Sequence, residues 1–360
     1  MLACMVRRAP SGPARAAFCC AALALGLAAA EGLARWRSPG LDPRPEVQGE
    51  LLRRASDPRL GTELVPLAEQ RLIFHDARGR SHQVLHRVNS QGWRGPERSR
   101  ARTPGLSRIA CLGDSHTFGH GVGDAETWPA ALERELGQRG VRAEVLNFGV
   151  GGFDTEQEAR LLETHALAFA PDLVLLQVFV NDALYPEFDY AALAPPTPWL
   201  KRLERDSGSW IAWLRRRSRL VDLAAESQQR RLGSRSFLGA CATTFTEGHP
   251  GRRRVEAALR AARELSAQRG ARFAVVFYPL LVREGRHLAT HAIGASLGQF
   301  CRAETIPFLD LEPTFLPLDI DRLRIHALDY HAGARAQAAA GAEIASFVLH
   351  EGLLQDAGGD

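Results

Sequence analysis

The chain has 360 residues, of which 45% are hydrophobic and 24% charged, and its formal net charge is +4. This is the composition of an ordinary globular protein with room for one α/β domain and additions, and no repeat or low-complexity array is present. The positive charges, nearly all arginine, do not form a basic stripe interleaved with aromatic side chains, so we expect no nucleic acid partner.

The N-terminal segment is basic and then apolar. Arginines precede an apolar run from Ala16 to Ala30, which Glu31 closes. Such a pattern is typical of a signal peptide, and the run is somewhat short of the ~20 residues that span a bilayer. Cleavage after the alanines at 28–30 would release the chain, whereas an uncleaved segment, extended by residues 32–34, would anchor it. We predict an exported protein in which residues 1–37 are a signal peptide or a membrane anchor, placing the rest in the periplasm or the exterior.

Residues 38–105 are rich in proline, arginine, glycine and serine, with short strand-like pieces such as Gln83–Asn89. A stretch of this kind lacks the long apolar patterns that build a large core. We therefore predict a linker and a lead-in to the main domain over residues 38–105, not a separate domain.

The apolar run Ile109–Leu112 predicts a buried strand, which breaks at Gly113 into a turn that carries Asp114 and Ser115. A serine there lies at the carboxyl end of a strand, where open α/β sheets place ligands. A following helix would bring backbone N–H groups able to stabilise an oxyanion. Ser115 is therefore the first candidate nucleophile, and we expect Asp114 to brace the turn.

Helical and strand patterns alternate after Ser115. They predict helices over residues 126–136, 154–168, 256–267, 287–302 and 333–349, and strands over 143–148, 173–180, 272–278 and 307–311. The run at 173–180 is typical of a central parallel strand. Strands separated by helices of this length imply βαβ units. We predict the α/β class, as a three-layer α/β/α flavodoxin-like sandwich with a central parallel sheet.

The alternation stops between Tyr185 and about Arg252. Trp210, Trp213 and Leu214 lie there among clustered arginines, which is compatible with an amphipathic helix on a membrane surface or with a helical cap over the site. A charge run beside an apolar stripe is usually the solvated face of a packed helix, which favours the cap. The role of this insertion at about 185–252 stays open.

The sequence Asp329-Tyr330-His331 stands directly before the last predicted helix. A serine hydroxyl is a weak nucleophile until a general base takes its proton, and that base needs an acid to orient it. We predict that His331 is the base for Ser115 and that Asp329 orients its imidazole.

Other residues compete for these roles. His326 is the main rival base, but no carboxylate precedes it at the same offset. Asp310 and Glu312, at a strand end, are possible substitute acids, although a solvated loop is the more ordinary interpretation. His116 and His120 are interpreted as pocket or surface residues, because side chains so close in sequence to Ser115 normally point elsewhere.

Four blocks resemble the GDSL/SGNH hydrolase family, in its membrane-associated bacterial esterases. Gly113-Asp-Ser115 resembles the first block, Asn147–Phe153 the glycine block, Val180–Asp182 the asparagine block, and Asp329-Tyr-His331 the pair that closes the catalytic set. Residues 89–95 resemble a segment that often precedes the first block. The resemblance spans roughly residues 106 to 350. It implies an SGNH hydrolase-like catalytic domain over 106–352.

The resemblance also implies an activity and an oxyanion hole. It implies hydrolysis of a carboxylic ester, such as an acyl or acetyl ester of a glycan or lipid, through an acyl-enzyme on Ser115. The Ser115 and Gly152 N–H groups and the Asn181 side chain would bind the oxyanion. Two departures are Phe179, where the family usually has glycine, and the absence of H-x-N-x-x-G after His331.

Two other functions stay open: an O-acyltransferase that moves an acyl group to a polysaccharide hydroxyl, and a catalytically silent carbohydrate-binding protein of the same fold. Neither G-x-G-x-x-G nor a phosphate-binding G-x-x-x-x-G-K-[ST] loop is complete, and no H-E-x-x-H or C-x-x-C occurs. We therefore expect no cofactor and no metal. A disulfide between Cys241 and Cys301 is possible in an oxidising compartment, and the oligomeric state stays open.

Overall fold

The computed structural model of the chain describes residues 12–37, 45–75, 81–184, 213–214, 217–326 and 329–354. These residues fall into two compact units. One comprises residues 1–42, 75–80 and 195–232, and the other comprises residues 43–74, 81–194 and 233–360. The second unit contains the predicted sheet.

Five parallel strands form this sheet, in the order β12-β9-β8-β6-β7. Their bounds are β6 Ser107–Gly113, β7 Ala143–Gly149, β8 Leu173–Val178, β9 Arg272–Phe277 and β12 Phe308–Asp310. Every residue of β6 and β8 is buried, which explains why Ile109–Leu112 and Leu173–Leu176 are apolar throughout. Because β6 lies between β7 and β8, Ile109 pairs with both Val145 and Leu173.

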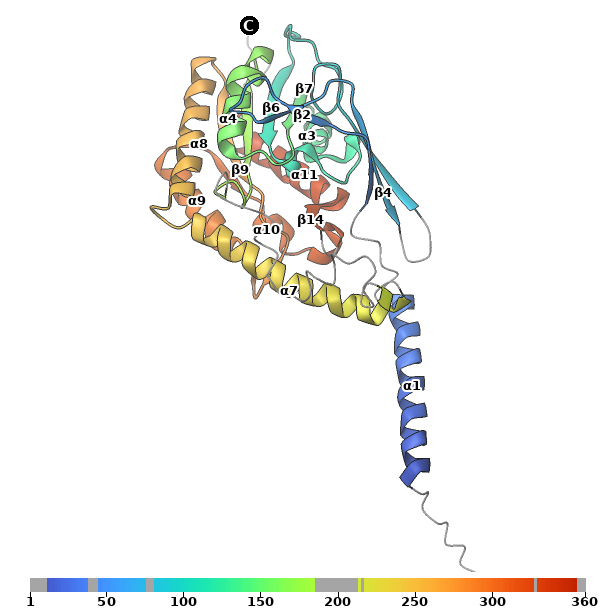
Figure 1. The fold of residues 1–360 in the computed structure, drawn as a ribbon. Helices are drawn as coiled ribbons and strands as arrows, with labels where there is room; N and C mark the ends of the chain where they lie inside the picture. Colours follow the sequence, from blue (N-terminus) through green and yellow to red (C-terminus); the bar gives the residue numbers. More distant parts are fainter. Residues whose placement is uncertain are drawn as a thin grey trace, which may run out of the picture. The chain divides into compact units, whose positions relative to one another are not determined.

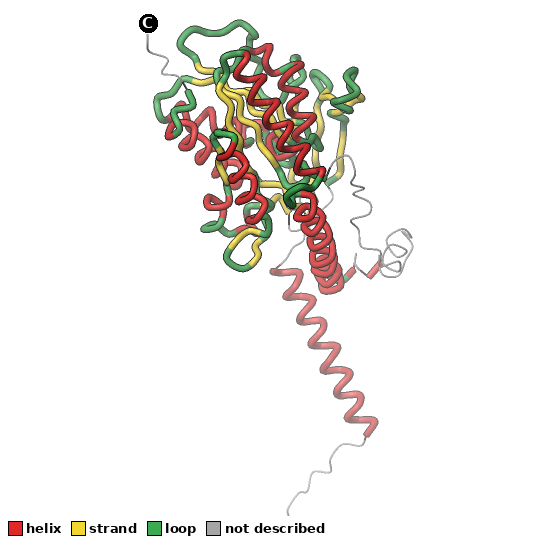
Figure 2. Tube along the Cα trace, turned by 90° about the vertical axis from the view of Figure 1, so that its left-hand side faces the viewer, coloured by secondary structure: helices red, strands yellow, loops and turns green. Residues whose placement is uncertain are grey.

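Helices cover both faces of the sheet. Helices α3 (Trp128–Gln138) and α11 (Ala334–His350) pack together on one face, and α4 (Thr155–Thr164), α8 (Pro250–Gln268) and α9 (His291–Ala303) cover the other (Figure 1). Figure 2 looks onto this second face, where long helices lie in front of the strands. The predicted three-layer α/β/α sandwich is therefore confirmed.

Local signals predicted most elements to within a few residues. Asp154 caps α4 as expected, since its side chain accepts the Gln157 N–H at 2.9 Å. The helix predicted over 154–168 is α4 followed by the short 3-10 helix η2 (Ala166–Phe169). The helix predicted from His287 starts only at His291. His287–Leu288 instead forms strand β11, paired with β10 (Arg283–Glu284) across a two-residue turn in which Gly285 has a φ of +59°.

The lead-in folds into two small sheets. Strands β1 (Glu46–Gln48), β4 (Glu69–His75) and β5 (Ser81–Arg87) form one, and β2 (Leu52–Arg54) pairs with β3 (Thr62–Leu64) in the other. Apolar side chains of this segment, among them Leu51, Leu60, Leu64 and Val88, join the hydrophobic core of the main sheet. The segment therefore packs on the sandwich as well as leading into it.

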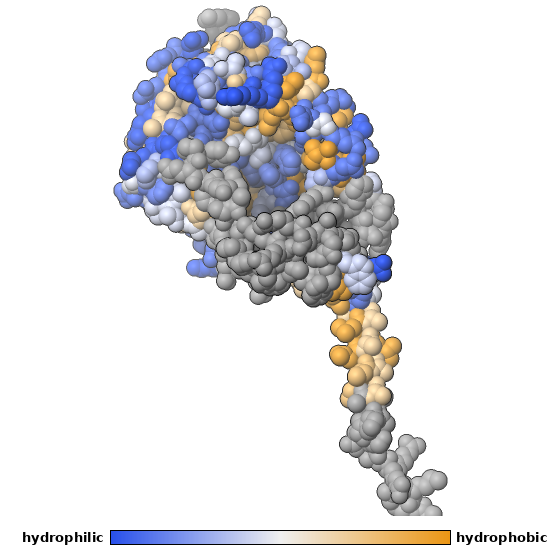
Figure 3. Space-filling model, in the orientation of Figure 1, coloured by the Kyte–Doolittle hydropathy of each residue, from blue (hydrophilic) through white to orange (hydrophobic). Residues whose placement is uncertain are grey.

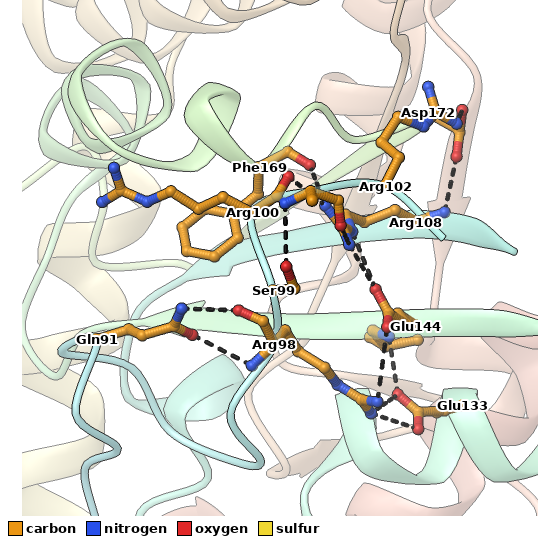
Figure 4. Close-up of polar contacts among 12 residues, drawn as sticks. Gln91, Arg98, Ser99, Arg100, Arg102, Arg108, Glu133, Glu144, Phe169 and Asp172 are labelled. Atoms are coloured by element: carbon orange, nitrogen blue, oxygen red, sulfur yellow. Dashed lines mark hydrogen bonds and ion pairs between the residues drawn. The ribbon is translucent and has the colours of Figure 1, made fainter. Parts of the chain in front are cut away.

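A network of arginines fastens the end of the lead-in to helix α3 and connects strands β6 and β7 (Figure 4). Arg98 donates from Nη2 to both oxygens of Glu133, at 2.6 and 2.8 Å. Arg108, on β6, is buried and donates from Nε and Nη2 to Glu144 on β7, at 3.0 and 2.7 Å. Its other donors reach backbone carbonyls, including that of Phe169 at 2.6 Å. Because this buried cation is paired and hydrogen-bonded, the cost of removing it from water is offset.

The first unit contains helix α1 (Gly12–Arg37). Its stretch Cys19–Trp36 is long and apolar enough to cross a membrane. The surface of α1 is apolar along most of its described length (Figure 3). A signal peptide and a membrane anchor both fit this helix.

Helix α7 (Arg219–Thr244) begins in the same unit, where the Glu31 carboxylate accepts the N–H groups of Arg219 and Leu220 at 2.7 and 3.1 Å. The expectations for Tyr185 and Trp210 lie outside the described residues. Trp213 is 49% exposed, with the Arg217 guanidinium 4.8 Å from its ring centroid.

Cys241 and Cys301 are buried free thiols. The disulfide considered between them does not form. Each side chain is instead enclosed in the core of the second unit, where burial raises the pKa of both thiols.

Candidate active site

Ser115 begins a helix directly after the central strand. Strand β6 ends at Gly113, and the short helix α2 spans Ser115–Phe118. Asp114 caps this helix, because its Oδ1 accepts the His116 N–H at 2.8 Å, so the expected bracing of the turn is confirmed. Burial raises the pKa of Asp114 to about 6, against hydrogen bonds that lower it.

Two glycines let α2 lie against the sheet. A Cβ at Gly113 would come within 2.1 Å of Thr117 Oγ1, and one at Gly149 within 2.2 Å of the Phe118 nitrogen. Asn147, on β7, completes this contact by donating from Nδ2 to the Thr117 carbonyl at 2.8 Å. Part of the glycine block therefore serves close packing beneath the serine.

The structure brings Ser115, His331 and Asp329 together. His331 Nε2 lies 2.9 Å from Ser115 Oγ, although the two residues are 216 positions apart. On the opposite side of the ring, His331 Nδ1 lies 2.6 Å from Asp329 Oδ1, which also accepts the His331 N–H at 3.0 Å. Both residues are on strand β14 (Asp329–Ala332). A hydroxyl, an imidazole and a carboxylate connected in this way can generate a serine nucleophile.

Asp329 and His331 shift each other's pKa in opposite directions. Burial alone would raise the pKa of Asp329, but the hydrogen bonds and charge of His331 hold it below its ordinary value. Burial alone would lower the pKa of His331, but the hydrogen bond and charge of Asp329 outweigh it and raise that pKa. The carboxylate is therefore ionised at neutral pH, and the imidazole is a stronger base than a free histidine.

Two further histidines flank His331. The rings of His120 and His116 have centroids 4.6 and 5.4 Å from that of His331. Burial lowers the pKa of His120 to about 4 and that of His116 well below its ordinary value. Both are therefore neutral at neutral pH, and among the three histidines it is His331 that takes up a proton. The rival base His326 has its side chain outside the described part of the structure.

The raised pKa of His331 predicts how the activity depends on pH. Because the base must be neutral to accept a proton, kcat/KM for an aryl ester should fall as pH drops through a His331 pKa that lies above the ordinary ~6.5. Asp329→Asn removes the charge that raises this pKa, so the acid limb should move to lower pH while the plateau falls. A limb that stays in place in Asp329→Asn would contradict the assignment.

The predicted oxyanion donors lie on neighbouring loops. Gly152 follows β7, has a φ of +84° and is exposed, and Asn181 follows β8. Because β6 lies between these two strands, their loops and Ser115 emerge at the same edge of the sheet. Asp182 holds the Asn181 loop, since its Oδ2 accepts the Thr155 hydroxyl at 2.7 Å. The roles of Gly152 and Asn181 stay predictions.

Phe179, which replaces a glycine usual in the family block, packs against His116 with ring centroids 4.2 Å apart. A polar residue further along the chain also contacts this region. Gln337 on α11 accepts the Trp128 N–H at 2.7 Å and donates to the His116 carbonyl at 3.0 Å. These contacts tie α11 and α3 to the serine helix.

The sequence did not indicate the role of Arg94. Its buried guanidinium donates to the carbonyls of Phe118, Gly119 and Val122 at 2.6, 2.6 and 2.5 Å, and to Asp124 Oδ1 at 3.0 Å. Burial lowers its pKa to about 10, so it remains charged at neutral pH. Arg94 lies in the segment 89–95 that resembles one preceding the first block, and that resemblance was the only available signal.

Removing this guanidinium should destabilise the loop behind the serine. In Arg94→Met, three carbonyls and Asp124 lose a buried donor, so we expect the free energy of unfolding to fall by about 3–5 kcal/mol. The same change at Arg102, which is exposed and makes one ion pair with Asp172, should cost at most about 1 kcal/mol. Urea unfolding followed by tryptophan fluorescence measures both. Equal losses in the two variants would contradict the role given to Arg94.

Two groups of histidine and carboxylate side chains among the described residues have a metal-like arrangement. One is His120, Asp329 and His331, which coincides with the candidate active site, and the other is His287, His291 and Glu312. Glu312 is 2% exposed and contacts these two histidines, so its interpretation as a substitute acid or a solvated loop residue is wrong. Asp310 accepts the Glu312 N–H at 2.8 Å, so it likewise lies beside this second group.

Comparison with known proteins identifies the family of the chain. The model of the GDSL-like lipase/acylhydrolase family matches residues 111–339. No curated protein matches the chain.

Solved structures with a similar fold include an esterase and a second hydrolase. The psychrotrophic esterase EstA from Pseudoalteromonas sp. is 13% identical, with a TM-score of 0.41 over 68% of this chain and 98% of that one. LAE5, described as an alpha/beta hydrolase from the metagenome of Lake Arreo, is 16% identical, with a TM-score of 0.43 over 69% of this chain and 96% of that one.

Proposed function

Because the chain belongs to the GDSL-like lipase/acylhydrolase family and is thus an ester-bond hydrolase, we propose that it is a serine esterase that works through an acyl-enzyme on Ser115. The observation that carries this proposal is the hydrogen-bonded series Ser115 Oγ, His331 and Asp329, with separations of 2.9 and 2.6 Å. These distances lie within the range that proton transfer and ring orientation require.

In the proposed mechanism, Ser115 Oγ attacks the ester carbonyl carbon while His331 Nε2 takes the hydroxyl proton. Asp329 stabilises the imidazolium that forms. When the tetrahedral intermediate collapses, His331 gives its proton to the leaving alcohol oxygen, and the acyl group stays on Ser115. Water, deprotonated by the same imidazole, then attacks the acyl-enzyme and releases the free acid.

The oxyanion of each tetrahedral intermediate would be bound by the N–H groups of Ser115 and Gly152 and by the Asn181 side chain. We expect Asn181→Ala to lower kcat by about 10²–10³ with little change in KM, because these donors act mainly on charge that develops in the transition state. Steady-state kinetics on an aryl acetate measures both constants. A rise in KM at constant kcat would assign Asn181 to substrate binding instead.

We propose as substrate an acyl or acetyl ester of a glycan or lipid outside the cytoplasm. The apolar helix α1, whose stretch Cys19–Trp36 is long enough to cross a bilayer, supports export and attachment to a membrane. Attachment would keep the catalytic unit near lipid or cell-envelope glycan, where such esters occur at a high local concentration.

Labelling with a fluorophosphonate tests the nucleophile. The full chain, purified in detergent, should carry the label on Ser115 as mapped by peptide mass analysis, and His331→Ala should abolish labelling. A folded protein that takes no label would overturn the esterase proposal and favour a silent carbohydrate-binding protein.

Product analysis distinguishes hydrolysis from acyl transfer. Transfer stays an alternative because the Asp329-x-His331 spacing resembles that of some polysaccharide acetylation proteins. With an acetyl donor and added glycan, a hydrolase releases free acid at a rate that the added glycan does not lower. Acyl-glycan that rises with glycan concentration at the expense of free acid would identify an O-acyltransferase.

A further inference from the structure

A second cluster of ionisable side chains lies where strand β11 and the first turns of α9 and of helix α10 (Glu312–Phe315) meet. His287 is on β11, His291 is the first residue of α9, and Glu312 is the first residue of α10, which follows β12. Each imidazole Nδ1 faces a different oxygen of one carboxylate, at 3.1 Å for His287 and 2.9 Å for His291. None of these residues belongs to the Ser115, His331 and Asp329 set, so a role for this cluster is independent of the proposed function.

The cluster is rigidly held on its inner side and accessible on its outer side. The Glu312 side chain is 3% exposed, whereas those of His287 and His291 are 48% and 49% exposed. Glu312 Oε1 also accepts the Leu288 N–H at 3.0 Å, which orients the carboxylate. The two rings stack with centroids 3.8 Å apart and an interplanar angle of 25°, and the ligand atoms of the three residues all lie within 4.8 Å of one another.

We propose that His287, His291 and Glu312 bind a divalent cation of the zinc type. Imidazole nitrogen and carboxylate oxygen are ligands that Zn²⁺ accepts, and two histidines with one glutamate are a known ligand set. Ligand atoms at 2.0–2.2 Å from a tetrahedral zinc lie roughly 3.3–3.6 Å from each other. The separations of 3.1 and 2.9 Å between the two Nδ1 atoms and the two Glu312 oxygens are shorter than this, so the cluster would open by roughly half an ångström to admit the ion.

The surrounding contacts are compatible with a bound cation. Asp310 Oδ1 accepts the Glu312 N–H at 2.8 Å and adds a second negative charge beside the site. Ligand carboxylates are commonly held by hydrogen bonds of this kind, as Glu312 is by Leu288. A bound cation would tie the β10–β11 hairpin and α9 to α10, next to the edge strand β12. Its remaining coordination position would take water or an external group.

Equilibrium dialysis of the full chain in detergent against ZnCl₂, after chelator treatment, tests the site. The wild type should bind zinc and unfold at a higher temperature in its presence, because a ligand specific for the folded state stabilises it. His287→Ala and His291→Ala should each weaken zinc binding by more than about 100-fold, since even the loss of an outer partner costs 10–100-fold. Glu312→Gln should act in the same direction.

His350→Ala is the matched control, because His350 also lies beside a carboxylate, with its Nδ1 3.3 Å from Glu351 Oε1, but its side chain is 86% exposed. This variant should bind zinc as the wild type does. If Glu312→Gln does not fold, His287→Ala and His291→Ala still test the site. Both imidazole rings are half-exposed, so their removal leaves no cavity in the core and the two variants should fold. Cobalt substitution adds a visible absorption band that reports on the ligands directly.

Two results would overturn the proposal. Zinc binding that survives His287→Ala and His291→Ala but is lost in His120→Ala would place the ion at His120, Asp329 and His331. Zinc binding that is absent from the wild type would leave His287, His291 and Glu312 as a hydrogen-bonded cluster only.

Discussion

Ser115→Ala should lower kcat for a short-chain aryl ester by about 10⁶-fold, which is the loss seen when a serine nucleophile is removed from a comparable set of residues. The fold should survive, because Asp114, and not Ser115, caps α2. The Ser115 hydroxyl contacts His331 within the site, so its removal takes away a contact of the site and not a helix cap. What activity remains would come from the oxyanion donors and substrate binding alone. Spectrophotometric assay of the purified full chain, with thermal unfolding as a check of folding, measures the effect.

Ser99→Ala is a matched control for this experiment. Its hydroxyl accepts the Ala101 N–H at 3.1 Å in an exposed part of the lead-in, so its loss should leave hydrolysis unchanged. If Ser115→Ala hydrolysed the ester at the rate of Ser99→Ala, the chemistry would belong to another residue and the acyl-enzyme proposal would fail.

His331→Ala should cost about as much as Ser115→Ala, because without a base the hydroxyl keeps its proton. Asp329→Asn should cost less, about 10⁴-fold, since the imidazole stays in place but loses the carboxylate that selects its tautomer and stabilises its charge. Single-turnover assays of the two variants with the same aryl ester would establish this order.

The double variant Ser115→Ala/His331→Ala sharpens this test. Residues that act as one unit are strongly non-additive, so the double variant should be no slower than either single one. His120→Ala is the comparison, because its neutral ring lies 4.6 Å from that of His331. A loss of activity in His120→Ala larger than in His331→Ala would identify His120 as the base.

Much of the fold could be predicted from local patterns. The strands β6 and β8 contain the apolar runs Ile109–Leu112 and Leu173–Leu176, because a parallel strand covered on both faces needs no polar side. Asp154 and Asp114 cap helices through contacts to residues two or three positions away, which depend on the neighbouring sequence only. The family resemblance rested on such short blocks, and the family match confirmed it.

Two predictions went wrong for different reasons. Helical spacing extended the predicted helix back to His287, but a tight turn at Gly285 pairs His287–Leu288 with β10. Glu312 was expected in a solvated loop, yet it is buried against two histidines more than twenty residues away. The first error gave helical spacing more weight than a local turn, whereas the second contact leaves no trace in the spacing of neighbouring residues.

The sequence by itself determined the layers of the fold and the two-residue offset between Asp329 and His331, because burial patterns and short turns are properties of contiguous chain. Only the tertiary structure decided that His331 meets Ser115 across 216 residues, and that Arg94 of the lead-in holds the loop behind that serine. Both contacts depend on how the sheet orders its strands and on what packs against its edge. This order arises from the burial of the whole sheet between its helices, to which each segment contributes only a part.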